Sequence, residues 1–395
     1  MSTPQVPQNP GEETTDLSKR YDIPLGLAHT TMQALKDRIK VHYDLASDYY
    51  LKLWGEHIHH GYWPTAASKA TESKETAQLN LIHLLLTTAA VTNEAVQVEA
   101  ASHATTATAA DTGTAVPIAV TNDTHVASTE RTPQHPLRIL DVGCGVGGTT
   151  RYLAKVLGAQ VTGITISGKQ VQIAQRLSRA AAITKSGGNV PSNDEGAVPN
   201  RADGATETDA EFITIGEKGG QVKFVELDAE KMSEYFAAEA GDAQGFDVVW
   251  ISEALSHFPN KALFFQNAHR LLRPGGKLVL ADWFKAEELG EGVFEADIKP
   301  IEDGMLLPPL CTQQDYVNLA TTAGLQVLGG PKDISLDVSK TWDISWSLIQ
   351  NPSLWAFAFS QGRDGIAFLQ AFRAMRRGYA NGSFRYAVMA FSKNA

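Results

Sequence analysis

The chain has 395 residues, 43% of them hydrophobic, so it can form one domain with a sizeable core and additional segments. Its 34 basic and 44 acidic residues give a formal net charge of −10, and no basic stripe is present. This charge argues against a nucleic-acid partner. The only two cysteines, Cys144 and Cys311, exclude a disulfide framework and a cysteine-based zinc site.

The opening stretch, "MSTPQVPQNPGEETTD", is polar and contains proline, whereas a secretory signal needs a basic start and an apolar core. No apolar run approaches the roughly 20 residues that cross a bilayer. We therefore expect a cytoplasmic protein without a transmembrane segment.

The first part of the chain divides by composition into three segments. Residues 1–35 lack apolar periodicity and predict a disordered tail, whereas residues 36–90 predict a helical flap. At the end of the flap, four apolar residues share one helix face: Leu79, Ile82, Leu85 and Leu86. Residues 91–136 are rich in Ala and Thr and have no stable period, so we expect a low-complexity insertion there.

Strand and helix patterns alternate over residues 137–283, which predicts an α/β core with a parallel sheet. A polar stretch at about 185–220 interrupts this alternation and predicts a second insertion. Residues 284–395 are mostly helical and aromatic, and they end in the strand-like "FRYAVMAFS". Within them, Thr312 and Asp315 have the spacing that begins a helix.

The glycine-rich stretch "DVGCGVGG" follows the first core strand and precedes a helix. Gly143, Gly145 and Gly148 fit the G-x-G-x-x-G spacing of dinucleotide sites, which usually have an acidic residue about twenty positions further on. The sequence there is "GITIS", residues 163–167, without a carboxylate. Asp141, just before the turn, would repel a pyrophosphate but suits a cation such as S-adenosylmethionine, which carries a sulfonium and an amino group.

The stretch "ILDVGCGVGGTTRYLAK" resembles the first motif of class I S-adenosylmethionine-dependent methyltransferases. The stretches "VHYDLASDYYLKLWGEHIHHGYW", "VTGITISGKQ", "FDVVWISEALSHFPNK" and "MRRGYANGSFRYAVMAFSK" are similar to the γ-tocopherol methyltransferase-like group, which is related to sterol methyltransferases and cyclopropane synthases. The resemblance covers about residues 43–86 and 137–393, outside the insertions. It implies an α/β, Rossmann-like methyltransferase sheet with an N-terminal helical flap and a C-terminal helical lid.

The resemblance also implies a set of cofactor-binding residues. The glycines let the backbone approach the cofactor, the segment 165–170 holds the ribose, and Asp228 with Ala229 contacts the adenine. For Asp228, a solvated turn residue is the alternative. The whole expected set is Tyr43, His59, Asp141, Gly143, Cys144, Gly145, Thr165, Ile166, Ser167, Gln170, Asp228, Ala229 and Ile251.

The stretch "HIHH" superficially resembles a metal site, with His57, His59 and His60 close together. Zinc sites need ligands that converge in space, and no second group of His or Cys stands out. We therefore expect no metal. The resemblance places this segment near the methionine part of the cofactor or at the substrate entrance, and simple packing is the alternative.

The stretch "ISEALSHF" follows the fourth core strand, where α/β folds bind ligands. On a helical turn Glu253 and His257 share one face, and a carboxylate beside an imidazole fixes its tautomer and raises its basicity. We predict that the pair positions the substrate and removes a proton; a helix cap with a surface histidine is the alternative. Ser256 stands where cyclopropane synthases have a carboxylate, which argues against lipid cyclopropanation.

The C-terminal segment carries large aromatic side chains that form either a helical core or a lid over a flat, apolar acceptor: Trp342, Trp346, Trp355, Phe357, Phe359, Phe368 and Phe372. Two interpretations also stay open for Arg373, Arg376 and Arg377, a solvated face or a peripheral contact with a membrane surface.

Together these features predict methyl transfer from S-adenosylmethionine to a carbon, nitrogen or oxygen atom of an apolar small molecule, in specialised metabolism. One alternative is a sterol or other lipid C-methyltransferase, although "WGEHIHHGYW" replaces the tyrosine-rich stretch of sterol enzymes. Another is a non-catalytic regulator that binds S-adenosylmethionine.

Overall fold

The computed structural model of the chain describes residues 32–91, 136–183, 211–239, 245–349 and 363–395. Most of the expected tail and of the first insertion therefore lie outside the described residues, as do Trp355, Phe357 and Phe359 of the expected lid. In the described part of the chain, no helix has the length and apolar character needed to cross a membrane.

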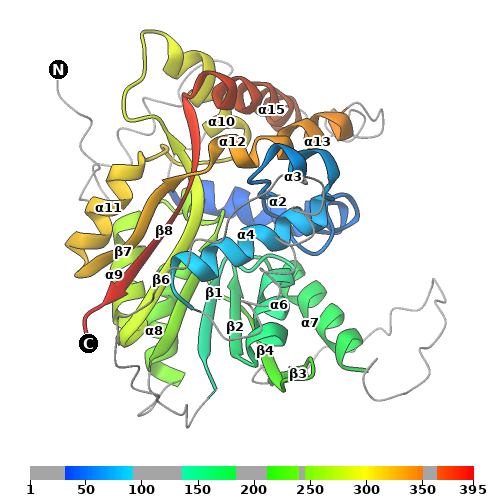
Figure 1. Ribbon diagram of the computed structural model, residues 1–395, viewed down its shortest axis with the longest axis vertical. Helices are drawn as coiled ribbons and strands as arrows, with labels where there is room; N and C mark the ends of the chain where they lie inside the picture. Colours follow the sequence, from blue (N-terminus) through cyan, green and yellow to red (C-terminus); the bar gives the residue numbers. More distant parts are fainter. Residues whose placement is uncertain (1–31, 92–135, 184–210, 240–244, 350–362) are drawn as a thin grey trace, which may run out of the picture.

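An eight-stranded sheet forms the centre of the protein, in the order β3-β4-β2-β1-β5-β6-β8-β7 (Figure 1). Its strands are β1 (Arg138–Val142), β2 (Gln160–Thr165), β3 (Ile213–Ile215), β4 (Gly220–Glu226), β5 (Phe246–Ser252), β6 (Leu272–Lys285), β7 (Leu325–Asp333) and β8 (Phe384–Lys393). The five strands from β4 to β6 are parallel, as predicted, and β3, β8 and β7 are antiparallel to their neighbours. Because the central strands are covered on both faces, their residues are buried almost throughout.

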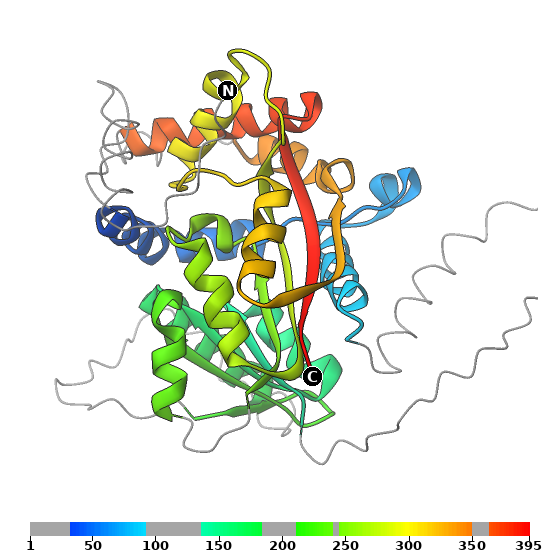
Figure 2. The ribbon, with the colours of Figure 1, turned by 90° about the vertical axis from the view of Figure 1, so that its left-hand side faces the viewer.

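Helices cover both faces of the sheet (Figure 2). They are α4 (Lys74–Thr88), α6 (Gly148–Leu157) and α7 (Gly168–Ile183) on one face, and α8 (Met232–Glu239), α9 (Lys261–Leu271) and α11 (Gln313–Thr322) on the other. Each face has its own apolar core, one containing Leu85 and Leu153 and the other Phe264 and Phe265. This arrangement confirms the α/β, Rossmann-like methyltransferase fold expected from the sequence.

The remaining helices form a flap and a lid at the carboxyl end of the parallel strands (Figure 1). The flap consists of α2 (Met32–Trp54) and α3 (Ala66–Thr71). The lid contains the π-helix η4 (Phe294–Ile298), α10 (Lys299–Gly304), α12 (Ser335–Val338), α13 (Lys340–Ile349) and α15 (Arg363–Asn381). Two short 3-10 helices, η2 (Ala229–Lys231) and η3 (Leu255–His257), follow β4 and β5.

Two edge strands correct the expected boundaries. Strand β3 lies within the stretch 185–220 that was expected to be an insertion, and it pairs with β4 through Ile213 and Ile215. Strand β7 lies within the expected helical lid and pairs with β8 across two register shifts. Both were missed because β3 is short and β7 is mostly exposed, so neither carries a clear apolar period.

The expected helix start at Thr312 is present as a reciprocal capping box with Asp315. We expect Thr312→Ala to lower the free energy of unfolding by about 1 kcal/mol, because the first turn of α11 loses its side-chain acceptor. Denaturant-induced unfolding measures this. Thr321→Ala, at an exposed position in the last turn of α11, is the control and should change stability less. Equal losses would show that the cap contributes nothing specific.

Candidate active site

Two cavities adjoin each other beneath the flap and the lid. One, the glycine-turn cavity, has a volume of about 880 Å³ including its open mouth, and Gly143, Gly145, Thr165 and Asp228 are among its lining residues. The other, the lid cavity, has a volume of about 850 Å³.

At Gly143 and Gly145 the glycine turn exposes its backbone to the glycine-turn cavity. The N–H groups of Gly143 and Cys144 both donate to the carbonyl of Ile164, at 2.9 and 3.0 Å, so the end of β1 is tied to β2. Gly143 and Gly145 have φ of 73° and 54°, values that favour glycine. A Cβ on Gly143 would lie 2.4 Å from the Cβ of Ala254, whereas a Cβ on Gly145 would meet no atom within 4 Å. Gly145 therefore faces open space.

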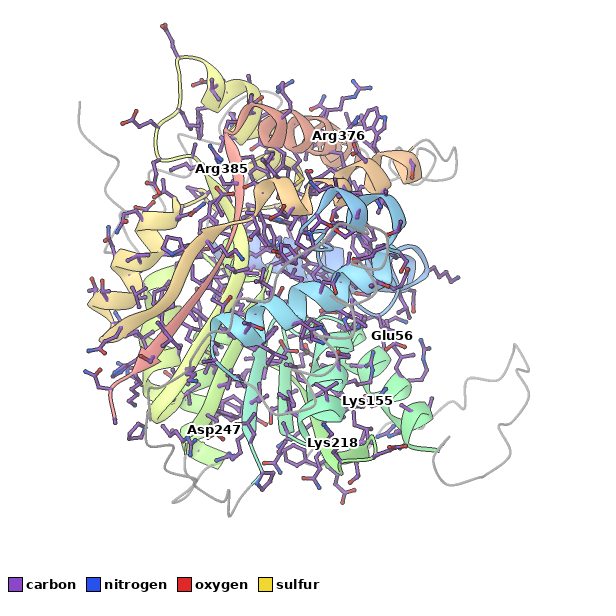
Figure 3. All side chains as sticks on the ribbon, in the orientation of Figure 1. Glu56, Lys155, Lys218, Asp247, Arg376 and Arg385 are labelled. Atoms are coloured by element: carbon purple, nitrogen blue, oxygen red, sulfur yellow. The ribbon has the colours of Figure 1, made fainter. Side chains whose placement is uncertain are left out.

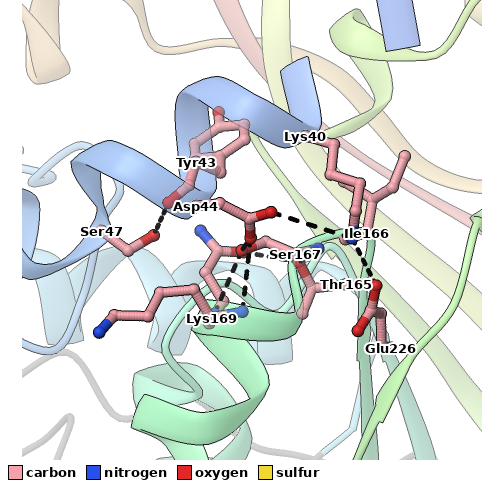
Figure 4. Close-up of polar contacts among 10 residues, drawn as sticks. Lys40, Tyr43, Asp44, Ser47, Thr165, Ile166, Ser167, Lys169 and Glu226 are labelled. Atoms are coloured by element: carbon pink, nitrogen blue, oxygen red, sulfur yellow. Dashed lines mark hydrogen bonds and ion pairs between the residues drawn. The ribbon is translucent and has the colours of Figure 1, made fainter. Parts of the chain in front are cut away.

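Helix α2 closes over the glycine-turn cavity through charged contacts (Figure 4). Lys36 pairs with Asp228, at 3.0 Å, and with Glu230. Lys40 pairs with Glu226 and donates to the carbonyl of Ile166 at 2.9 Å. These contacts join the flap to the loops that follow β2 and β4.

The chemistry of this cavity fits the expected S-adenosylmethionine. Among its described lining residues, Asp228, Glu230 and Glu253 are acidic and Lys36 is basic, so the lining carries more negative than positive charge. Such a lining favours a cation and opposes a pyrophosphate. Apolar side chains, including Ile39, Ile58, Leu227 and Phe258, provide surfaces for a flat base.

Most of the residues that were expected to bind the cofactor come together here. The expected residues that do line the glycine-turn cavity are Tyr43, Gly143, Gly145, Thr165, Ile166, Gln170, Asp228 and Ala229. Cys144 and Ile251 are buried outside this lining, and Ser167 donates to Asp44 of α2 at 2.5 Å. His59 lines the lid cavity instead. The binding roles of all these residues stay predictions.

Asp141 lies outside the lining of both cavities, although the sequence suggested that it faces a cationic ligand. Its carboxylate accepts a hydrogen bond from the Thr150 hydroxyl at 2.6 Å, which links the end of β1 to α6. Burial raises the pKa of Asp141 to about 7, and the Thr150 hydrogen bond opposes this rise. A role in holding the glycine turn fits this placement better than direct contact with the ligand.

The lid cavity is lined by aromatic and imidazole side chains. Trp342, Phe368 and Phe372 of the expected lid are among them. No Lys or Arg belongs to its described lining, and Glu253 is the one carboxylate there. The two cavities share the residues Ile39, Tyr43, Ile58, Glu253 and His257, so these residues mark the junction between them.

Glu253 occupies this junction in an unusual backbone conformation, with φ of 56° directly after β5. Non-glycine residues in the left-handed region often mark functional sites, where the surrounding contacts compensate for the strain. The backbone N–H of His60 and the hydroxyl of Tyr386 donate to Glu253 Oε1, both at 2.7 Å, and His60 Nδ1 lies 3.0 Å from the same oxygen.

The expected pairing of Glu253 with His257 is therefore corrected. The partner of His257 is Tyr43, whose hydroxyl lies 3.4 Å from His257 Nε2. Burial lowers the pKa of His257 to about 4, and the nearby charges of His42 and Lys261 lower it further. Without a directly bonded carboxylate, this imidazole is neutral near pH 7 and is not tuned to that pH.

His59 and His60 of "HIHH" have different hydrogen-bond partners. His59 Nδ1 contacts the carbonyl of His60 at 2.9 Å, whereas His60 contacts Glu253. Burial lowers the pKa of His57 to about 3, and the nearby His59 lowers it further. No group of three or more side chains in the described part of the chain is arranged to hold a metal ion.

Sequence reasoning did not assign a role to several residues of the site. Tyr386 belongs to the last strand, and only the fold of the sheet brings it to Glu253. Lys36 and Asp44 face the cavity loops because they lie on one side of α2. The spacing of charged residues on α2 could have suggested a buried ionic face, but a solvated face has the same pattern.

The arginines of α15 make contacts within the lid. Arg376 pairs with Asp343 at 3.0 Å and lies 5.1 Å from the ring centroid of Trp346 (Figure 3). Arg373 lies 5.9 Å from the same centroid, and Arg377 pairs with Asp297. These contacts connect α15 to α13 and η4, and a peripheral membrane contact stays a prediction.

Comparisons with known proteins identify the family of the chain. A family model described as a methyltransferase domain matches residues 119–328, more than half of the chain. A chloroplastic tocopherol O-methyltransferase of Arabidopsis thaliana is 25% identical over 95% of this chain and 87% of its own. Cycloartenol-C-24-methyltransferase 1 of Oryza sativa subsp. japonica is 26% identical over 52% of this chain and 48% of its own.

Among solved structures, a mycolic acid cyclopropane synthase complexed with SAH and CTAB has a TM-score of 0.59 at 15% identity, covering 91% of this chain and 98% of its own. This likeness concerns the fold. On the match to the family model, the chain belongs to the methyltransferase domain family. Within that family it is one of the S-adenosylmethionine-dependent small-molecule methyltransferases, so the cofactor and the family expected from the sequence are confirmed.

We expect Gly145→Ala to weaken binding of S-adenosylhomocysteine at least about tenfold, because the added methyl group enters the glycine-turn cavity. Isothermal titration calorimetry measures the affinity. Gly219→Ala is a matched control: Gly219 also has a positive φ, 70°, and open space around a Cβ, but it does not line the cavity. Normal binding by Gly145→Ala would contradict the assignment of the cofactor to this cavity.

Proposed function

We propose that the protein transfers the methyl group of S-adenosylmethionine to a carbon, nitrogen or oxygen atom of an apolar small molecule in specialised metabolism. The observation that supports this most is the pair of adjoining cavities that share Tyr43, Glu253 and His257. Methyl transfer needs two ligands in separate sites whose reacting atoms meet, and such alignment can contribute about 7–11 kcal/mol to lowering the barrier.

In this proposal the glycine-turn cavity holds the cofactor and the lid cavity holds the acceptor. Bound S-adenosylmethionine supplies an activated methyl group on a sulfonium. Gly143 and Gly145 let the backbone approach it, and the segment from Thr165 to Gln170 and Asp228 with Ala229 bind its adenosine part. Helices α2 and α3 of the flap and the helices of the lid close over the carboxyl end of the parallel strands and exclude water.

Glu253 and His257 act on the acceptor at the junction of the cavities. The ionised carboxylate of Glu253 accepts a hydrogen bond, or a proton, from the reacting group of the acceptor. The neutral imidazole of His257 and the hydroxyl of Tyr43 orient that group. Burial raises the pKa of Tyr43 to about 12, with the charge of Glu253 adding to the effect, so this hydroxyl stays protonated.

The lining of the lid cavity supports an apolar and uncharged acceptor. Aromatic side chains such as Trp342 and Phe372 favour a flat or greasy molecule, and the carboxylate of Glu253 opposes an anion. A sterol or other lipid C-methyltransferase is the alternative, which the likeness to the cycloartenol enzyme favours. Ser256, buried where cyclopropane synthases have a carboxylate, argues against cyclopropanation.

A non-catalytic regulator that binds S-adenosylmethionine is the second alternative. The lid cavity argues against it, because a protein that only binds S-adenosylmethionine does not need a second site beside the cofactor. We also propose a cytoplasmic location, which imaging of the tagged full chain in the native cell would test.

One experiment tests the proposed function directly. The protein is incubated with methyl-labelled S-adenosylmethionine and a metabolite extract, and mass spectrometry identifies the product that carries the label. An apolar small-molecule product is expected. Cofactor binding without any labelled product would favour the regulator, and a labelled sterol or acyl lipid would favour the lipid alternative.

On the identified acceptor, we expect Glu253→Gln and His257→Ala each to lower kcat about 10²-fold or more, while S-adenosylhomocysteine binds almost normally, because both residues act on the acceptor. Steady-state kinetics and calorimetry measure the two effects. Since the two side chains have different hydrogen-bond partners, the double variant should be worse than either single variant. Near-normal turnover in both singles would remove their catalytic role.

The pH profile provides a further check. Activity needs ionised Glu253 and neutral His257. Burial opposes ionisation of Glu253, but His60 and His59 hold its pKa below the usual range. The pKa of His257 is about 4. Both conditions fail only as the pH falls, so kcat/KM should decrease on the acid side, below about pH 5. A profile in which these variants alter a step between pH 6 and 8 would contradict the assignment.

A further inference from the structure

The two oxygens of the Glu253 carboxylate have different surroundings. All three donors described above, the His60 N–H, the His60 imidazole and the Tyr386 hydroxyl, converge on Oε1. From the described part of the chain, Oε2 receives no hydrogen bond, and it is not among the enclosed polar atoms that lack a partner. Because Glu253 lines both cavities, Oε2 is the carboxylate oxygen that is left to contact a ligand where they meet.

The donors come from elements that are themselves firmly held. His60 is held through both of its neighbours: the side-chain amide of Gln78, on α4, donates to the carbonyl of His59 at 3.1 Å, and the N–H of Gly61 donates to the hydroxyl of Thr341 at 3.1 Å. Tyr386 is fully buried in β8, between β6 and β7. These contacts fix the Glu253 carboxylate from two sides of the sheet end.

The surroundings keep Glu253 charged and its tyrosine partner neutral. Burial opposes ionisation of Glu253, but the charge and hydrogen bonds of His60, with the charge of His59, hold its pKa below the usual range. Burial and the nearby carboxylate raise the pKa of Tyr386 well above the usual range, so its hydroxyl donates. The groups that face Glu253 from the packed elements are His59, His60, Tyr43, His257, Tyr379 and Tyr386.

We propose that His60 and Tyr386 are positioning residues that fix the Glu253 carboxylate through Oε1 and thereby direct a charged Oε2 to the junction of the cofactor and acceptor cavities. This inference rests on the proposed function, since it needs a cationic cofactor in the glycine-turn cavity. It assigns a second task to Glu253, because a negative charge at the junction stabilises a sulfonium and does not stabilise the neutral thioether left after methyl transfer.

The test needs no acceptor. Calorimetry gives the affinities of S-adenosylmethionine and S-adenosylhomocysteine between about pH 3 and 8, a range that extends below the usual pKa of a glutamate. The ratio of the two affinities reports the negative charge near the sulfur atom. In the wild type, this ratio should fall as Glu253 is protonated on the acid side. We call this fall of the ratio with pH the protonation step. In Glu253→Gln the ratio should be lower at pH 7, and the protonation step should be absent.

Tyr386→Phe removes one donor to the ionised carboxylate, so the pKa of Glu253 should rise and the step should move to higher pH by about one unit. His60→Asn keeps a donor near the position of Nδ1 without the charge, whereas His60→Ala loses both. The step in His60→Asn should therefore lie between those of the wild type and His60→Ala.

Tyr316→Phe is the matched control. Tyr316 is equally buried and donates to another buried carboxylate, Asp282, at 3.0 Å, but it lines neither cavity. Tyr316→Phe should lose about as much stability as Tyr386→Phe. The pH at which the affinity ratio falls should stay that of the wild type. If Tyr386→Phe does not fold, the His60 variants provide the same measurement.

The outcomes separate the two proposals. A wild type that binds neither ligand would overturn the proposed function. A wild type that binds both, with a step at the same pH in Tyr386→Phe, His60→Ala and the wild type, would overturn the positioning role alone. The same result follows if the affinity ratio does not change in Glu253→Gln.

Discussion

The proposed active site depends on keeping one carboxylate charged where two largely apolar cavities meet. Removing an ion from water costs several kcal/mol unless hydrogen bonds and opposite charges compensate. Around Glu253, this compensation comes from distant parts of the chain, the "HIHH" segment before α3 and strand β8. The left-handed conformation at Glu253 turns its side chain toward these donors, so the backbone strain and the hydrogen bonds belong to one arrangement.

The same requirement explains the attachment of the additional segments to the core. The flap is joined to the cofactor cavity by ion pairs and hydrogen bonds, such as those of Lys36 and Asp44, and it also contributes Tyr43 to the junction. Contacts of this kind can break and re-form in water more readily than a packed apolar surface, which suits a segment that covers a ligand. The lid instead packs its aromatic side chains around the acceptor cavity.

The relation to the known methyltransferases follows from this division. The glycine turn and the parallel strands constitute the part that holds a common cofactor, and the family match lies mainly there. The lid cavity lies beside the glycine turn and has its own lining, which includes Trp342 and Phe372. We therefore expect the shape of the lid cavity to determine which acceptor binds.

The sequence by itself determined the local features: the central strands, the glycine turn, the α11 capping box at Thr312 and the aromatic character of the lid. These depend on apolar period and on neighbouring residues, which can be read from a single stretch of chain. Tertiary structure decided which side chains contact one another. The spacing of Glu253 and His257 suggested that they pair, but the left-handed turn at Glu253 separates them and places His60 and Tyr386 at the carboxylate. Asp141, which borders the turn in sequence, contacts Thr150 instead of the cavity. Contacts between residues more than a hundred positions apart depend on how the sheet is assembled, and no local pattern contains that information.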